Sequence, residues 1–276
     1  MLQSLLITLL AVFAFIGCGG EEASKGTADK FMPDNNLWME DGFVDNGMTE
    51  AIFNDIIDNI IDYYAPIAEK FQAELVVSKQ WKSSTVNASA NQMGDTWQVT
   101  FYGGLARRPE ITPLGFATVI CHELGHHFGG YPNSGWASNE GNSDTFATHV
   151  CLKKILVNSQ EEIPVLPQIA IDMCDKAYTG NDRKVCYVSM GAAQSTANLL
   201  AALGGDNYPR YDTPDPKKVK VTDNAHPEAQ CRFDTMIAGA RCTKAWRDDI
   251  IPTSRNQALY NCTEGEAARP RCWYAP

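Results

Sequence analysis

The sequence predicts a helix-dominated α+β fold, and three observations point to that class. The chain has 276 residues, of which 44% are hydrophobic, enough for one substantial core. Apolar residues recur at helical spacing over several long segments. Strand-like segments gather between residues 74 and 102, directly before a helix with clear boundary signals. We therefore expect one domain over residues 48–276, with a small sheet packed before that helix.

The first predicted helix follows Thr49, because isoleucines repeat at helical spacing over residues 52–61. It is expected to end near Pro66, since proline is disfavoured in the interior of a helix. Two strands are predicted next, at residues 74–78 and 97–102. A polar loop rich in asparagine and serine is expected to separate them.

The helix after these strands has the clearest boundary signals in the sequence. Thr112 can cap it, Pro113 occupies its first turn, and two glycines at 129–130 follow its last turn. The next helix is predicted at residues 139–155, with Glu140 and Asp144 in its first turns. Further helical patterns cover residues 163–179, 183–203 and 227–240.

The charge balance excludes two classes of partner. The chain carries 23 basic and 33 acidic residues, a formal net charge of −10. Binding to nucleic acid requires a basic face that releases counterions, and anionic lipid attracts clustered basic residues. We therefore expect no nucleic-acid partner and no polybasic contact with a membrane.

The N-terminus has the pattern of an export signal. Residues 5–16 form an apolar run of signal-peptide length, too short to span a bilayer comfortably. Cys18 follows it between glycines, and a polar spacer comes next. This arrangement resembles the lipobox of bacterial lipoproteins, in which the cysteine becomes the lipidated first residue. Ordinary cleaved secretion and a retained anchor are the alternatives.

The lipobox resemblance implies three segments and a location. Residues 1–17 would be the signal peptide, and residues 18–47 a tether with an irregular lead-in. The exported domain would face the periplasm in the cell envelope, attached to the outer membrane through lipid alone.

The cysteine count agrees with export, since eight cysteines remain after Cys18. An even number in an exported chain predicts four disulfides in an oxidising compartment. Eight cysteines allow 105 pairings, so sequence does not determine the connectivity. Short separations favour the pairs 174–186, 231–242 and 262–272, which leaves Cys121 with Cys151. A zinc–cysteine site is the alternative, but the CxxC spacing that it favours does not occur.

A metal-binding pattern lies on the helix that starts at Pro113. His122 and His126 are four residues apart, so one helix face can present both imidazoles to one metal ion. Glu123 lies beside the first ligand, where it can act as a general base toward a water molecule at the metal. The helix therefore carries an HExxH motif.

A third ligand is needed, because a catalytic zinc takes three protein ligands and keeps one position open. Glu140 and Asp144 are also four residues apart, on the next predicted helix. If the two helices pack against each other, Glu140 can complete the ligand set. Asp144 can then accept the free ring N–H of a ligand histidine and fix its tautomer. The alternative is a helix start that is merely rich in acidic residues.

HExxH followed by ExxxD on a later helix resembles a gluzincin-type zinc peptidase. Within that group, the chain is similar to the family that contains HtpX, the CAAX prenyl endopeptidases and the periplasmic BepA-type proteases. Residues 87–90 (NASA) resemble the family's NAxA segment, and residues 97–105 (WQVTFYGGL) its strand before the HExxH helix. His226, Pro227 and Arg232 reproduce its HPxxxxR pattern. Residues 139–144 also fit the NExxSD of thermolysin, so that motif does not settle the branch.

The resemblance implies a zincin-like, disulfide-stapled metallopeptidase domain that holds one Zn²⁺ per chain. Its residues would be metal ligands (His122, His126, Glu140), a general base (Glu123), a residue behind the ligands (Asp144) and groups near the oxyanion (His226, Arg232). In BepA-type relatives the matching histidine can instead cap the zinc. A protein or peptide substrate is expected to add as a strand to Gln98, Val99, Thr100 and Phe101.

Two departures limit what the resemblance implies. HtpX and the prenyl endopeptidases are polytopic membrane enzymes, and their substrates are not carried over to this cysteine-rich chain. His127 and His149 match no family position and are expected to be packing or solvent histidines. Besides a zinc endopeptidase, two functions stay open. One is a metal-binding but non-catalytic envelope chaperone or assembly factor, and the other a structural lipoprotein with a fortuitous HExxH.

Overall fold

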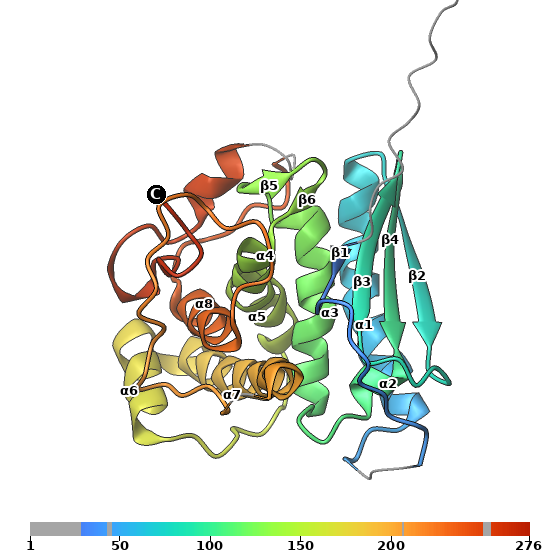
Figure 1. Cartoon of the computed structure of the whole chain (residues 1–276). Helices are drawn as coiled ribbons and strands as arrows, with labels where there is room; N and C mark the ends of the chain where they lie inside the picture. The colour runs from blue at the N-terminus through green and yellow to red at the C-terminus, as the bar shows by residue number, and fades with distance from the viewer. Residues whose placement is uncertain (1–28, 43–45, 206, 251–254) are drawn as a thin grey trace, which may run out of the picture.

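The computed structural model describes residues 29–42, 46–205, 207–250 and 255–276 (Figure 1). Helices account for 47% of it and the sheet is small, so the predicted α+β class is confirmed. The predicted signal peptide, the lipobox at Cys18 and most of the predicted tether lie outside the described residues.

Helix α1 (Glu50–Lys70) begins as predicted, with Thr49 accepting a hydrogen bond from the backbone N–H of Ile52. The predicted end near Pro66 is wrong, because the helix continues through this proline. Ile67 and Ala68, beyond the proline, are buried in the core. Their burial offsets the single backbone hydrogen bond that proline cannot make.

Four strands form the main sheet in the order β1-β3-β4-β2. They are β1 (Asp29–Lys30), β2 (Glu74–Gln80), β3 (Ala88–Met93) and β4 (Thr96–Tyr102). β4 runs parallel to β2 and antiparallel to β3, and β1 runs antiparallel to β3. The predicted strands correspond to β2 and β4.

Strand β3 lies where a loop was predicted, and that prediction is wrong. Its sequence, ASANQM, is small and polar, so it gives only a weak alternating signal. Ala88 and Ala90 nevertheless point into the core, with 1% and 0% of their surface exposed. Gly94, at a positive φ of 59°, makes the turn into β4.

The expected substrate strand is also wrong. Residues 98–101 pair with β2 on one side and with β3 on the other, so β4 has no open side along this stretch. An added peptide needs unpaired backbone groups at the edge of a sheet. β3 lies on the side of the sheet nearest to the HExxH helix. Its outer backbone groups, which β4 does not use, pair with β1.

The HExxH helix is α3 (Pro113–Phe128), and its predicted boundaries are confirmed. Thr112 caps it by accepting from the N–H of Gly115, and Gly129 follows its last turn. A short helix, α2 (Gly103–Ala106), precedes it, and a small hairpin follows it, made of β5 (Asn133–Ser134) and β6 (Ala137–Ser138).

The predicted helix 139–155 forms as one helical stretch in three parts. These are α4 (Glu140–Phe146), a π-helical turn (Ala147–Cys151) and α5 (Leu152–Leu156). Asn139 caps its start by accepting from the N–H of Asn142.

The predicted helices at residues 163–179, 183–203 and 227–240 correspond to α6 (Gln168–Ala177), α7 (Gly180–Gly204) and α8 (Ala229–Arg241). Short 3₁₀ helices follow at Arg255–Tyr260 and Gly265–Ala267.

Helix α3 runs through the middle of the molecule (Figure 1). The sheet and α1 lie on one side of it, and α4, α5, α7 and α8 lie on the other. One buried apolar cluster extends through both sides and includes Phe53, Val99, Phe116, Val150 and Phe233. The residues of α3 are therefore held by packing on two faces.

The described residues contain four disulfides, and two of the predicted pairs are confirmed, Cys121–Cys151 and Cys174–Cys186. The predicted pairs 231–242 and 262–272 are wrong, because Cys231 bonds to Cys272 and Cys242 bonds to Cys262.

The reason is helix geometry. Cys231 lies in the first turn of α8 and Cys242 directly after its last residue. A helix rises about 1.5 Å per residue, which separates these two positions by roughly 16 Å. A disulfide tolerates at most about 7 Å between Cα atoms. The C-terminal segment is thus joined to both ends of α8.

The disulfides indicate an oxidising, exported environment. Among the helices in the described part of the chain, none is both long and apolar enough to cross a membrane.

Candidate metal centre

The predicted ligands come together between α3 and α4. His122 and His126 lie one turn apart on α3, with their ring centroids separated by 4.9 Å. Glu140 is the first residue of α4, and its carboxylate faces both rings. Oε2 lies 3.3 Å from His122 Nε2, and Oε1 lies 3.6 Å from His126 Nε2. These three side chains could hold a metal ion, since their ligand atoms all lie within 4.8 Å of one another.

The chemistry of this group fits a bound cation. His122, His126 and Glu140 are at most 2% exposed. Within the described residues, neither Nε2 atom and neither carboxylate oxygen of Glu140 makes a hydrogen bond. Buried polar atoms without hydrogen bonds are costly, and coordination of a cation removes that cost. Two imidazole nitrogens and one carboxylate are a donor set that suits a divalent transition metal such as zinc.

Hydrogen bonds behind the two histidines fix their orientation. The Nδ1–H of His122 donates to Asp144 Oδ1 at 2.8 Å, and the Nδ1–H of His126 donates to the carbonyl of Ser138 at 2.8 Å. In both rings this leaves Nε2 as the nitrogen with a free lone pair. The predicted role of Asp144 behind a ligand histidine agrees with this geometry.

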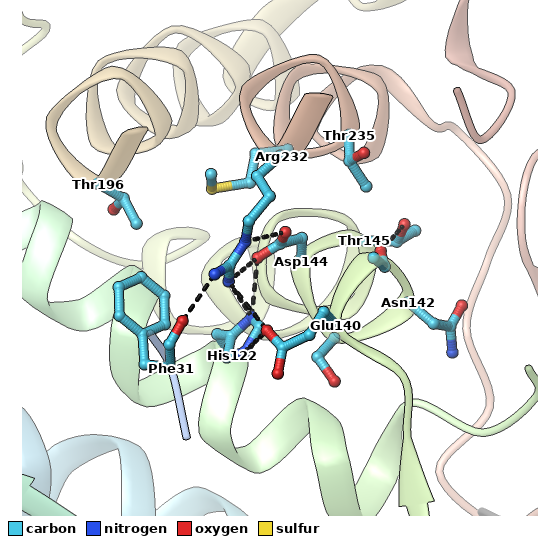
Figure 2. Close-up of polar contacts among 12 residues, drawn as sticks. Phe31, His122, Glu140, Asn142, Asp144, Thr145, Thr196, Arg232 and Thr235 are labelled. Carbon is cyan, nitrogen blue, oxygen red and sulfur yellow. Dashed lines mark hydrogen bonds and ion pairs between the residues drawn. The ribbon is translucent and has the colours of Figure 1, made fainter. Parts of the chain in front are cut away.

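Arg232, on α8, secures Asp144 from the other side (Figure 2). Its Nε and Nη2 donate to the two oxygens of Asp144, each at 2.8 Å, and its Nη1 donates to the carbonyl of Phe31 at 2.7 Å. Nη2 also lies 3.4 Å from Glu140 Oε2. Every nitrogen of the guanidinium thus faces a protein oxygen. The predicted place of Arg232 near the oxyanion is therefore wrong, because its donors are engaged behind the ligands, where Arg232 positions them.

Arg232 also sets the charge of the two acids. Burial by itself raises the pKa of Glu140, but the charge of Arg232, assisted by the adjacent imidazoles of His122 and His126, outweighs it and lowers the pKa to about 2. The same balance of burial against Arg232 and His122 holds the pKa of Asp144 well below its ordinary range. Both carboxylates are therefore ionised at neutral pH, as a metal ligand and its hydrogen-bond partner require.

Glu123 is fully buried beside the first ligand. Among the residues that the structure describes, neither of its carboxylate oxygens has a hydrogen-bond partner. Burial raises the pKa of Glu123 well above its ordinary range. The charge of His122 opposes that rise, and Glu140 adds to it. A buried carboxyl group that is free of hydrogen bonds is available for proton transfer.

The start of α4 is covered by a residue from far along the chain. An added Cβ at Gly141 would lie only 2.2 Å from the ring of Trp273, so the ring packs directly on this backbone. Trp273 is fully buried, and the disulfide between Cys272 and Cys231 fixes its neighbour to α8. The C-terminal segment is therefore part of the wall around Glu140.

His226 comes close to the ligands, as the sequence pattern predicts. Its Nε2 lies 3.3 Å from Glu140 Oε1, and the same nitrogen donates to the carbonyl of Lys30 at 2.6 Å. About a quarter of its side chain is exposed, unlike those of the buried ligands. The structure thus brings together all of the predicted residues except the substrate strand.

Sequence reasoning missed the contribution of β1 and the residue after it. Asp29 Oδ2 lies 3.5 Å from His126 Nδ1. The ring of Phe31 meets the ring of His122 edge-on at 5.1 Å, and the Arg232 guanidinium lies 4.7 Å above the Phe31 ring. These residues belong to a segment interpreted as a tether and lead-in. No periodicity in the sequence reveals that this segment pairs with the sheet.

The two remaining histidines, His127 on α3 and His149 in the π-helical turn, are packing residues. His127 stacks between Trp97, at 5.2 Å, and Trp136, at 5.0 Å, and burial lowers its pKa to about 3. His149 is buried and donates to the carbonyl of Lys244 at 2.8 Å.

Comparison of the chain with models of protein families, with curated proteins and with solved structures finds no match in any of the three.

Proposed function

We propose that the chain is a zinc-dependent endopeptidase of the bacterial cell envelope. One observation carries the proposal. A buried His122–His126–Glu140 group stands beside Glu123, a buried carboxyl group without a hydrogen bond to any described residue. The HExxH spacing and the ExxxD pattern that resembles gluzincin peptidases support the same assignment. One Zn²⁺ per chain and a protein or peptide substrate follow from it.

In this proposal His122, His126 and Glu140 hold the zinc, which when bound polarises the scissile carbonyl. The charge of the bound zinc would counter the effect of burial on Glu123 and keep its carboxylate ionised. Glu123 then accepts a proton from the attacking water as the oxygen of that water bonds to the carbonyl carbon. The C–N bond then breaks, and Glu123 returns the proton to the leaving amine. His226 donates a hydrogen bond toward the carbonyl oxygen, on which negative charge develops. Arg232 and Asp144 keep His122 oriented throughout.

The substitution Glu123→Gln tests the general base. The amide has nearly the same shape but cannot take up the proton, so hydrolysis of casein should fall by about 10²-fold or more. Zinc content, measured by elemental analysis, should stay at that of the parent. Glu69→Gln, on α1, is the control and should behave as the parent does. Casein hydrolysis by Glu123→Gln at the parental rate would show that the assignment of the base is wrong.

The closed surroundings of the ligands favour one alternative, a metal-binding envelope chaperone or assembly factor without catalysis. His122, His126 and Glu140 are at most 2% exposed, as in a metal site that only holds helices together. Suppression of aggregation of a denatured client, measured beside casein hydrolysis, separates the two functions. Glu123→Gln should keep the first and lose the second. A parent that suppresses aggregation but never hydrolyses casein would support the alternative.

We also propose that the mature protein is a lipoprotein attached through Cys18, with its domain at the periplasmic face of the outer membrane. The lipobox pattern and the exported environment indicated by the disulfides support this. Incorporation of labelled palmitate into the parent but not into Cys18→Ser is the expected result.

A further inference from the structure

Residues 29–31 occupy the edge of the sheet that a peptide substrate would need. β1 pairs antiparallel with β3, with Asp29 opposite Ala90 and Lys30 opposite Ser89. The N–H of Phe31 continues the pairing by donating to the carbonyl of Ala88 at 3.0 Å. An extended peptide recognised by its backbone would have to make these same contacts with β3.

The same three residues also engage groups around the metal ligands. His226 donates to the carbonyl of Lys30 at 2.6 Å, and Arg232 donates to the carbonyl of Phe31 at 2.7 Å. The carboxylate of Asp29 lies 3.5 Å from His126 Nδ1. His226, the group assigned to the scissile carbonyl, is thus bound to a carbonyl of the chain itself.

From these contacts we propose that residues 29–31 are a built-in occupant of the peptide-binding edge. They hold the place of a substrate, and hydrolysis requires that they leave β3. The inference rests on the proposed peptidase function, and it adds a form of self-inhibition to it.

The segment has a fixed point and a part that can be displaced. Asn87 clamps Met32, since its side chain accepts from the N–H and donates to the carbonyl of that residue, both at 3.1 Å. On the other side of the clamp, the side chains of Asp29 and Lys30 are 40% and 42% exposed. Between them Phe31 is fully buried against His122 and is the anchor of the occupant. Displacement needs only this short stretch to move.

Asp29→Pro in the zinc-loaded full chain tests the proposal. Proline disrupts the pairing of β1 with Ala90, and the half-exposed position spares the core. Two rates are measured, casein hydrolysis and transfer of zinc to a chelating dye. Each should rise by about tenfold or more, because the open state becomes more populated. Asn36→Pro, which places proline at an exposed residue beyond Met32, is the matched control and should change neither rate.

A capped peptide of residues 29–34 (DKFMPD) should bind the open edge of Asp29→Pro and return both rates toward those of the parent. Phe31→Ala gives an independent test of the anchor. Phe53→Ala is its control, because Phe53 is equally buried but packs on Trp81 and Phe116, away from the ligands. Faster zinc transfer in Phe31→Ala but not in Phe53→Ala supports the proposal.

The two readouts separate the occupant from the peptidase. If zinc transfer accelerates in Asp29→Pro and the peptide reverses it, but casein is never hydrolysed, residues 29–31 do cover the site and the peptidase function is wrong. If the parent hydrolyses casein and Asp29→Pro changes neither rate, the peptidase stands and the occupant is wrong.

Discussion

The guanidinium of Arg232 and the carboxylate of Asp144 are joined by two hydrogen bonds of 2.8 Å, with both side chains about 1% exposed. The Oδ1 atom of Asp144 also accepts from His122. The contact therefore links α8 to α4 and, through Asp144, to α3. The orientation of one proposed ligand depends on residues that never touch the metal.

Arg232→Lys should weaken zinc binding. Lysine keeps the positive charge but cannot donate to both oxygens of Asp144 in the geometry of the guanidinium. Loss of such a contact behind a ligand lowers metal affinity about 10- to 100-fold, measurable by competition with a chelator. Arg210→Lys is the control, because Arg210 makes the same two-bond contact with Asp212 at an exposed site. Equal zinc affinity in the two variants would contradict the role of Arg232.

Gly125→Ala should push helices α3 and α4, which carry the proposed ligands, apart. An added Cβ would lie 2.9 Å from the Cα and 3.0 Å from the carbonyl oxygen of Ser143, both backbone atoms of α4. Crowding of this kind costs about 1–3 kcal/mol of folding free energy. Thermal unfolding and a zinc titration should both show the loss. An unchanged melting temperature together with unchanged zinc affinity would mean that the helices can move apart freely.

Removal of the Cys121–Cys151 disulfide should both destabilise the protein and speed dissociation of the proposed zinc. This bond joins the HExxH helix to the π-helical turn that continues α4. Its sequence separation is 30, which corresponds to about 3–4 kcal/mol in the chain-entropy model. The double change to serine should therefore lower the free energy of unfolding and speed zinc dissociation.

The Cys174–Cys186 disulfide is the matched control for that experiment. It joins α6 to α7, which carry none of the proposed ligands, and its separation of 12 corresponds to about 3 kcal/mol in the same model. Its removal should destabilise the protein without changing zinc dissociation. Equal acceleration of zinc dissociation in both variants would contradict the specific role of Cys121–Cys151, because it would show that lower stability of the whole fold is enough to release the metal.

His149 should make the protein sensitive to mild acid. Burial, assisted by the charge of Lys153, lowers the pKa of His149 to about 4 in the folded chain. The unfolded chain takes up the proton near pH 6.5, so stability falls as the pH drops from 6.5 toward 4. At pH 5 this residue costs about 2 kcal/mol relative to pH 7. His149→Gln removes that term, as denaturant unfolding at both pH values should show. A difference between variant and parent that is the same at pH 5 and pH 7 would contradict the prediction.

Local signals predicted helices α3 and α4 well. Thr112 and Asn139 mark helix starts because each accepts a hydrogen bond from an N–H three residues later, and both bonds form. Pro113 occupies the first turn, as predicted. The spacing of His122 and His126 is likewise a local property of a helix. Glu140 was predicted from its position in a second such helix and a family pattern, and the packing of α3 on α4 brings it to the histidines.

Most contacts between segments far apart in the chain could not be predicted from the sequence. β3 is built of small and polar residues, and its strand form depends on pairing with β4 rather than on its own preference. The pairing of β1 with β3 joins residue 29 to residue 90. The bond from Cys231 to Cys272 likewise depends on where the C-terminal segment returns to α8. Short separation along the chain was a poor guide, because the straight helix between Cys231 and Cys242 keeps them apart.

The ring of Trp273 on the backbone of Gly141 has a consequence for biogenesis. A polypeptide leaves a ribosome or a translocation channel from its N-terminus, so the helix that starts at Glu140 emerges long before the tryptophan that shields it. Until Trp273 has emerged, the carboxylate of Glu140 lacks this neighbouring ring, and Cys231 lacks its disulfide partner Cys272. In the proposed zinc enzyme, loading of the metal should accordingly be a late maturation event, completed only after Cys231 and Cys272 have formed their disulfide.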